Sequence, residues 1–278
     1  MSLFIASLNS GSNGNCYYIG NQNEAILIDA GISCREIEKR MKRLELNVRK
    51  VKAVFITHEH ADHISGVATF TKKFHVPVYI TSATLMHSRL RLKEELIKSF
   101  KPYEPIDVGS LIIIPFPKLH DASDPYSFIV NCNKINVGVF TDIGTPCHQL
   151  IKHFKQCHAA FLETNYDEQM LDKGNYPFVL KNRIRGGMGH LSNKQALELF
   201  TTHKPAFMSH LFLSHLSENN NCPGLVHELF GRQSGNVKMI VASRYQETAV
   251  YHIEHPYVSR LKKMHRRAAS SQLSFSFG

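Results

Sequence analysis

Within six consecutive positions, the chain carries four side chains of the types that bind metal ions: His58, His60, Asp62 and His63. The apolar run 53–56 just before them predicts a buried strand. Residues two apart in an extended chain point the same way, so His58 and His60 can bind one ion together. Apolar residues at helical spacing over 64–74 predict a helix, whose start turns the other two side chains toward a second ion. The segment therefore predicts a hydrolytic site for two divalent ions, either Zn or Mn.

More side chains of these types follow other predicted strands. The apolar strands expected at 24–28, 111–116, 135–140, 159–162 and 206–213 are followed by Asp29, His120, Asp142, Glu163 and His215. Asp29 can alternatively cap the helix expected at 33–44. Strands that precede helices in each half, with the polar residues at strand ends, predict an α/β protein. We expect a four-layer αββα sandwich with the site along one edge of its two sheets.

The chain contains no linker-like composition before about residue 255. We therefore expect one catalytic domain over residues 1–255 and a basic, flexible tail over 256–278. A long amphipathic helix is expected over 82–100, and another is expected to run to His203. Ser192 or Asn193 would cap the second of these helices, and both are candidate phosphate contacts.

The loop Asn9-Ser-Gly-Ser-Asn-Gly-Asn15 separates two predicted strands. Such a loop is most simply a hairpin turn. Its backbone amides, together with Ser12 and Asn13, can also receive a phosphate group.

The formal net charge is +10, with a pI near 9.3. A basic surface favours a polyanionic partner, most simply nucleic acid. No apolar run approaches the ~20 residues that span a membrane, and the N-terminus lacks the pattern of a signal peptide. We therefore expect a cytoplasmic protein with no membrane partner.

The order of these motifs resembles that of the metallo-β-lactamase superfamily over nearly the whole chain. The resemblance implies that His58, His60 and His120 hold one metal ion. It assigns Asp62, His63 and His215 to a second ion, with Asp142 bridging the two. Asp29 would then brace the histidine cluster from behind the metal ligands.

Three later segments resemble motifs of the nuclease branch, including the RNase Z type: Glu163-Thr-Asn, Gly189-His190-Leu-Ser192 and Ser214-His215-Leu-Ser217. By this resemblance Glu163 orients His190, and His190 protonates the departing oxygen while Asp62 belongs to the catalytic metal site. Only 215 − 142 = 73 positions separate Asp142 from His215, too few for the inserted domain of β-CASP nucleases. The compact YycJ/WalJ-type subfamily fits best, which implies a DNA exonuclease acting 5′ to 3′ through a water activated by two metals.

Other readings remain open at this point. The same cluster suits a ribonuclease of RNase Z-like chemistry, a hydrolase of small esters, thioesters or lactones, and a metal-binding protein without turnover. The C-terminal segment with Gln272, Leu273, Phe275 and Phe277 resembles peptides that bind the bacterial replication sliding clamp. A terminus without a partner is the slightly favoured alternative, because so short a segment matches many sequences by chance.

Overall fold

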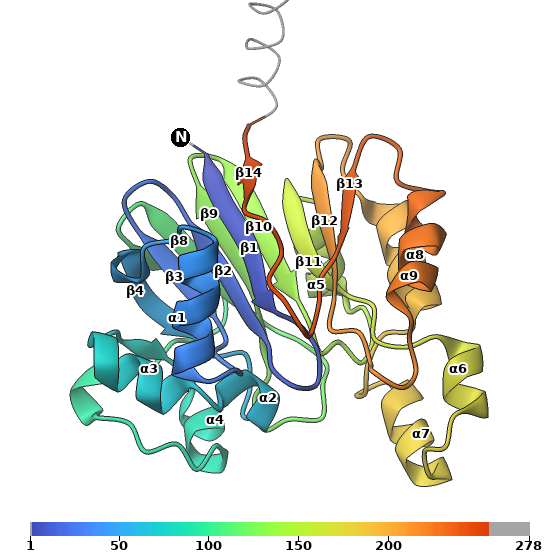
Figure 1. The fold of residues 1–278 in the computed structure, drawn as a ribbon, viewed down its shortest axis with the longest axis horizontal. Helices are drawn as coiled ribbons and strands as arrows, with labels where there is room; N and C mark the ends of the chain where they lie inside the picture. Colours follow the sequence, from blue (N-terminus) through green and yellow to red (C-terminus); the bar gives the residue numbers. More distant parts are fainter. Residues whose placement is uncertain (1, 256–278) are drawn as a thin grey trace, which may run out of the picture.

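The computed structural model describes residues 2–255, and within them two seven-stranded sheets pack face to face with helices on both outer sides (Figure 1). The expected αββα sandwich is confirmed. The expectations for the basic tail and for Gln272, Leu273, Phe275 and Phe277 concern residues outside this range.

The first sheet combines the N-terminal strands with one late strand. Its order is β14 (Tyr251–Ile253), β1 (Leu3–Asn9), β2 (Cys16–Gly20), β3 (Ala25–Ile28), β4 (Val51–Phe55), β5 (Val78–Tyr79) and β6 (Ile97–Lys98). Strands β3 to β6 run parallel. Ile28 pairs with Phe55, so β3 and β4 end level with each other. This register places Asp29 beside the segment that begins the histidine cluster.

The second sheet has the order β13 (Lys238–Val241), β12 (His210–Ser214), β11 (Ala159–Glu163), β10 (Ile135–Phe140), β9 (Tyr126–Cys132), β8 (Leu111–Pro117) and β7 (Ile106–Val108). Strands β10 to β13 run parallel. Phe140 pairs with Leu162, and Glu163 pairs with Ser214. The chain therefore leaves β10, β11 and β12 at one edge, where Glu163 ends β11 and Asp142 and His215 follow β10 and β12.

Three apolar layers hold the sandwich together. The central layer lies between the sheets and includes Phe55, Phe128 and Phe161, all fully buried. Separate layers lie between each sheet and its helices. Because both faces of each sheet are covered, its central strands are apolar on both faces, as the continuous apolar runs in the sequence indicate. Burying one such side chain contributes roughly 1.5–3 kcal/mol.

The helices divide into covering helices and edge helices (Figure 1). The first sheet is covered by α1 (Cys34–Arg43) and α3 (Val67–Phe74), and the second by α5 (His148–Phe154), α8 (Asn193–His203) and α9 (Pro223–Gly231). Around one end of the sandwich lie α2 (Ala61–Ile64), α4 (Ser82–His87), α6 (Glu168–Lys173) and α7 (Phe178–Arg185). Short 3₁₀ turns occupy Val48–Lys50 and Glu94–Leu96. None of the helices in residues 2–255 has the length and apolarity needed to cross a bilayer.

Several expected element boundaries are wrong. The helix expected over 82–100 ends at His87, and the chain then passes through Arg89 in a left-handed conformation (φ 56°) to the edge strand β6. The helix expected over 64–74 is two helices, α2 and α3, with the break at Ser65 and Gly66. Strand β12 begins only at His210. In the first case, pairing of β6 with β5 overrides the local helical pattern.

Candidate metal centre

The loops that leave six strands at one edge bring the predicted metal-binding side chains together. Groups whose ligand atoms all lie within 4.8 Å of one another include His58 with His60 and His120, Asp62 with His63 and His215, and His58 with His63 and Asp142. Asp142 also lies in a group with Glu163, His190 and His215. The structure thus gathers residues from both sheets into one continuous cluster.

The first group consists of three imidazoles whose nitrogens converge. His58 Nε2 lies 3.0 Å from His60 Nδ1, which lies 3.4 Å from His120 Nε2. Burial lowers the pKa of His58, and it lowers that of His120 to about 4. Both rings are therefore neutral near pH 7, the form in which a histidine offers a lone pair to a metal.

The second group combines imidazoles with a carboxylate. Asp62 Oδ2 lies 3.4 Å from both His63 Nε2 and His215 Nε2. Burial would raise the pKa of Asp62, but the two histidines hold it far below its usual range. This group therefore presents a negative charge to a bound cation.

Asp142 lies between the two groups. Its Oδ2 is 3.2 Å from His63 Nε2, and its Oδ1 is 4.0 Å from His120 Nε2. The Oδ2 atom is buried and accepts no hydrogen bond from residues 2–255. Burial raises the pKa of this carboxyl, but the neighbouring His215 and His63 bring it well below the usual value. A buried carboxylate oxygen without a donor fits a site that takes up a cation.

The outer nitrogens of His58, His63 and His120 are held by protein acceptors. His120 Nδ1 donates to the Gly189 carbonyl at 3.0 Å, and His63 Nδ1 donates to Asp29 Oδ2 at 2.7 Å. Thr57 Oγ1 donates to Asp29 Oδ2 at 2.8 Å, so this hydroxyl can only accept from His58 Nδ1, 2.9 Å away. Such bonds fix the ring orientation and leave the inner nitrogens free for a metal. Asp29 therefore supports the cluster, and Ser33, rather than Asp29, caps α1.

Glu163 connects two histidines through one oxygen. Its Oε1 lies 2.8 Å from His190 Nδ1 and 2.9 Å from His215 Nδ1. Its Oε2 accepts from the backbone nitrogens of Ile143 and Leu191. Burial opposes ionisation, but the two imidazoles lower the pKa of Glu163 to about 2. The expected pairing of Glu163 with His190 is present, and the second bond to His215 was not expected.

The donor set fits divalent cations. The cluster contains four buried or half-buried carboxylates, Asp29, Asp62, Asp142 and Glu163. Burial alone disfavours the charged form of a carboxylate. The charge of these carboxylates overcomes the effect of burial and raises the pKa of His63 and His215. The raised pKa values show that the surroundings of these two rings favour positive charge, which a bound cation would also supply. Imidazole and carboxylate together are ligands for zinc or manganese.

Two residues beside the cluster were missed from sequence. Asn15 Nδ2 donates to Asp62 Oδ2 at 3.1 Å, while its Oδ1 accepts from Tyr17 and from the Gly11 backbone. Lys118 is buried, donates to the Thr141 carbonyl, and has its pKa lowered by burial. The Ser/Gly/Asn loop that ends at Asn15 could have indicated this residue, but no sequence pattern indicates that Lys118 lies beside the cluster.

The candidate phosphate contacts are spread over different environments. Ser12 is exposed and lines a cavity beside His190. Asn13 hydrogen-bonds to Asn9 and to the Arg244 carbonyl. Ser192 is the N-cap of α8 and also donates to Glu168, and Asn193 is buried against Asn221. The structure therefore places only Ser12 at the mouth of the site.

Close backbone contacts hold the cluster loops in place. A Cβ on Gly31 would lie 1.7 Å from the Asp62 carbonyl oxygen, so only glycine lets the loop after β3 approach α2. Similarly, a Cβ on Gly189 would lie 2.2 Å from the Arg183 carbonyl. These contacts fix Asp62 and the His190 segment relative to the sheets.

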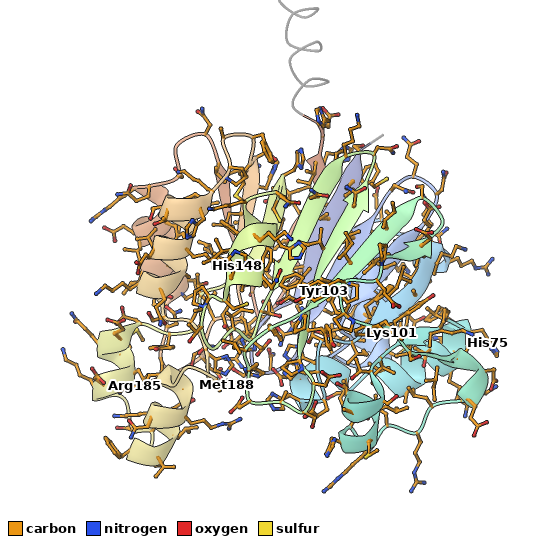
Figure 2. The ribbon with its side chains drawn as sticks, turned by 180° about the vertical axis from the view of Figure 1, so that it is seen from behind. His75, Lys101, Tyr103, His148, Arg185 and Met188 are labelled. Carbon is orange, nitrogen blue, oxygen red and sulfur yellow. The ribbon has the colours of Figure 1, made fainter. Side chains whose placement is uncertain are left out.

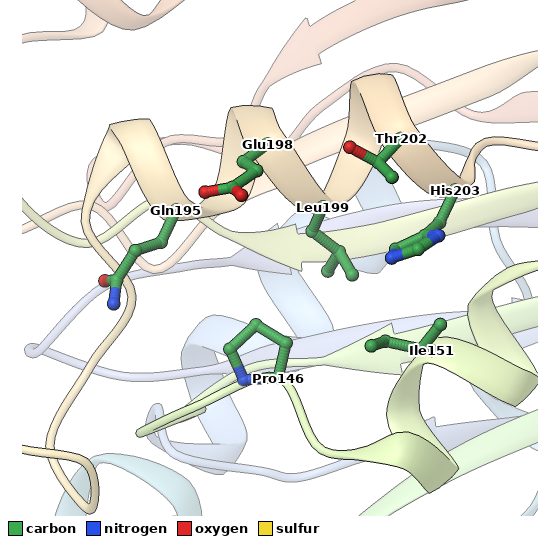
Figure 3. Close-up of a pocket in the computed structure, with 7 residues that line it drawn as sticks. All are labelled: Pro146, Ile151, Gln195, Glu198, Leu199, Thr202 and His203. Carbon is green, nitrogen blue, oxygen red and sulfur yellow. The ribbon is translucent and has the colours of Figure 1, made fainter.

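Two cavities differ in their relation to this cluster. One of about 190 Å³ lies beside His190 and is also lined by Ser12, Tyr176 and Arg183. The other, of about 280 Å³, lies between α5 and α8 and is lined by Pro146, Ile151, Gln195, Glu198, Leu199, Thr202 and His203 (Figure 3). None of the clustered residues lines this second cavity, whereas His190 lines the first. The first cavity is therefore the candidate substrate site.

Residues 10–148 match the family model described as the metallo-beta-lactamase superfamily. The chain belongs to the metallo-beta-lactamase superfamily. The match ends before Glu163, His190 and His215, which lie in the second half of the chain.

Relatives within this superfamily extend the match over most of the chain. The exodeoxyribonuclease YycJ of Bacillus anthracis is 31% identical over 224 residues, covering 80% of this chain and 85% of that protein. The exodeoxyribonuclease WalJ of Streptococcus pneumoniae is 28% identical over 225 residues, covering 79% and 84%. The expected resemblance to the YycJ/WalJ type is confirmed. The protein is a metal-dependent hydrolase, and its His and Asp clusters suit a divalent metal.

A solved superfamily structure shares the fold. The metallo-beta-lactamase fold protein YhfI of Bacillus subtilis aligns with a TM-score of 0.70 at 15% identity, covering 91% of this chain and all of that one. At this level of identity the similarity concerns the fold alone.

Proposed function

We propose that this protein is a metal-dependent phosphodiesterase, specifically a DNA exonuclease that acts from 5′ to 3′. The observation that carries the proposal is the Glu163–His190 pair at the edge of the metal-binding cluster, 2.8 Å apart. Hydrolysis of a phosphodiester needs a proton for the departing oxygen, because an alkoxide is a poor leaving group. The two relatives named as exodeoxyribonucleases support DNA as the substrate.

In this proposal His58, His60 and His120 would hold one divalent ion, and Asp62, His63 and His215 would hold the other. Asp142 would contribute to both sites, while Asp29 orients His63 directly and His58 through the Thr57 hydroxyl. Bound ions of this kind supply Lewis-acid activation of water and neutralise charge on the phosphate. The ligands suit zinc and manganese alike.

His190 has the position required of the proton donor. Its Nδ1 is bound to Glu163, and the ring lines the cavity of about 190 Å³ with 22% of its side chain exposed. The carboxylate fixes the ring so that Nε2 remains for the substrate. His190 donates its proton to the leaving 3′ oxygen, and Glu163 stabilises the charged ring.

The overall charge agrees with a nucleic-acid substrate. With a net charge of +10, the protein attracts the phosphate backbone without regard to sequence. A hydrolase of small neutral esters has no need of such a charge. We therefore favour nucleic acid over small substrates, and the two relatives named as exodeoxyribonucleases favour DNA over RNA. We keep the sliding clamp as a partner predicted from the tail alone.

Product analysis tests the proposal. Duplex DNA, single-stranded DNA and RNA of one sequence, labelled at either end, are incubated with the protein loaded with zinc or with manganese. We expect 5′-labelled DNA to give short labelled products that disappear with chelator and in Asp62→Ala. Cleavage of RNA alone would favour the ribonuclease reading. If no strand is cut while a small ester is, the nuclease proposal is wrong.

A further inference from the structure

Arg183 stands on the wall of the cavity that His190 lines. It belongs to α7, a helix with no buried residue, and 58% of its side chain is exposed. Its Nε donates to Asp121 Oδ2 at 2.5 Å. The other oxygen of Asp121 lies 3.4 Å from His120 Nε2. An exposed arginine is thus held in place by the residue next to a predicted metal ligand.

The backbone fixes this arrangement at three more points. The Asp121 nitrogen donates to the Met188 carbonyl, and the His190 nitrogen donates to the Ile184 carbonyl. Gly189 packs directly against the Arg183 carbonyl. Met188 and Arg185 both lie at the end of the molecule that carries α6 and α7 (Figure 2). Arg183 therefore keeps a defined place relative to His190 although its side chain is exposed.

The guanidinium of Arg183 retains most of its donors. Arginine has five N–H groups, and only the one on Nε is bound to a group within residues 2–255. The four on Nη1 and Nη2 remain, and a guanidinium matches the oxygens of a phosphate. Arg185 on the same helix differs, because its Nη2 binds Asp172 and it does not line this cavity.

We propose that Arg183 binds the phosphate next to the scissile one, on the side of the leaving group. The inference rests on the proposed function, in which His190 protonates the leaving 3′ oxygen. The departing nucleotide then lies on the His190 side, against the wall formed by Tyr176, Leu180 and Arg183. Its own phosphate meets Arg183, either as a terminal 5′-phosphate or as the next internal linkage. The terminal phosphate and the internal linkage both present anionic oxygens that a guanidinium can bind.

The test compares Arg183→Gln with Arg185→Gln, which removes the same charge from the same helix. One substrate is bis(p-nitrophenyl) phosphate, a diester without a second phosphate. The others are single-stranded DNAs with a 5′-phosphate, with a 5′-hydroxyl, or with an uncharged methylphosphonate at the neighbouring linkage. Metal content and the binding of a fluorescent phosphorothioate strand by anisotropy are measured alongside activity.

We expect Arg183→Gln to raise KM for DNA and to weaken strand binding about tenfold or more, the usual cost of losing a charged hydrogen bond. Metal content and the rate on bis(p-nitrophenyl) phosphate should stay within about twofold, and Arg185→Gln should change DNA binding by less than about threefold. If Arg183→Gln weakens binding only of strands that carry a 5′-phosphate, Arg183 binds the terminal phosphate. If the parent and Arg183→Gln no longer differ on the methylphosphonate strand, Arg183 binds the internal linkage.

Other outcomes overturn the assignment. Equal losses in both variants would mean that only net charge matters. Lower metal content and lower activity on the small diester would mean that Arg183 merely supports His120 through Asp121. DNA cleavage that is unchanged in Arg183→Gln would also contradict it. By contrast, a parent protein that hydrolyses the small diester but neither cuts nor binds DNA would contradict the nuclease proposal itself.

Discussion

Asp29 and His63 are both fully buried, and Asp29 Oδ2 accepts a 2.7 Å hydrogen bond from His63 Nδ1. The same carboxylate also accepts bonds from the backbone nitrogen and the hydroxyl of Thr57. It thereby holds two segments of the histidine cluster from the side opposite the converging nitrogens. The geometry predicts that Asp29 controls metal affinity although it is not itself placed to bind metal.

Replacing Asp29 with Asn tests this role. Asp29 has a left-handed backbone (φ 59°), which Asn tolerates, so the fold should be retained. Both carboxylate oxygens of Asp29 accept hydrogen bonds, whereas the Asn amide has a single oxygen that can accept. We therefore expect metal affinity to fall about 10- to 100-fold. Titration against a chromogenic chelator measures the affinity, and circular dichroism checks the fold. Unchanged affinity in a folded variant would show that the Asp29 bonds do not orient the ligands.

His190→Ala separates proton donation from metal binding. We expect turnover of DNA to fall about 10²- to 10⁴-fold, the range for loss of a general acid. Bis(p-nitrophenyl) phosphate should be affected much less, because its leaving group departs without a proton. Metal analysis should give the content of the parent protein. Loss of metal in this variant would make His190 a ligand rather than an acid.

Removing the metal should destabilise the protein. Without cations the carboxylates of the cluster face each other in a buried space, and Asp142 Oδ2 has no donor within the described residues. A ligand present at 100 times its Kd stabilises a protein by about 2.7 kcal/mol. We therefore expect chelator to lower Tm by several degrees and added zinc or manganese to restore it. In Asp142→Ala this metal-dependent difference should shrink, and a full response there would exclude Asp142 from the site.

His158, remote from the metal centre, should make the protein sensitive to acid. Its buried ring accepts a hydrogen bond from the Asn136 nitrogen at Nδ1, and burial, followed by the nearby His255, lowers its pKa to about 4. The unfolded chain, with an ordinary pKa near 6.5, takes up the proton first. Stability from this residue is therefore present above about pH 6.5 and is lost as pH falls toward 4.

His158→Asn keeps an acceptor near the Nδ1 position but cannot be protonated. Urea unfolding at pH 7 and pH 5 should show a smaller loss of stability in this variant than in the parent. His75→Asn, at an exposed site, is the matched control. Equal losses in parent and variant would rule out His158 as a source of the acid sensitivity.

The sequence predicted the sandwich and the cluster because both depend on short-range patterns. Apolar runs gave β10 and β11 nearly to the residue and β4 to within two residues, and the polar residues after them met because parallel strands end at one edge. The left-handed conformations of Asp29, Asp142 and His215 could not be predicted in this way. They arise where the chain must turn sharply to aim a side chain inward, and the packed sheets maintain them.

Other features depend on contacts that no local pattern reveals. Lys118 resembles any charged residue after a strand, yet it is buried beside the carboxylates. Helix α7 has no buried residue and so lacks a clear apolar stripe. The helix expected over 82–100 failed because pairing of β6 with β5 outweighed a helical pattern in the sequence.

Glu163 Oε1 accepts hydrogen bonds from both His190 and His215. Any substitution that reorients the proton donor through this oxygen must also disturb a predicted metal ligand. Metal affinity and proton transfer therefore cannot be adjusted separately at this position. A variant selected for tighter metal binding through Glu163 should show a changed pH–rate profile as well, and adaptation of this enzyme to a different metal would have to proceed through other residues.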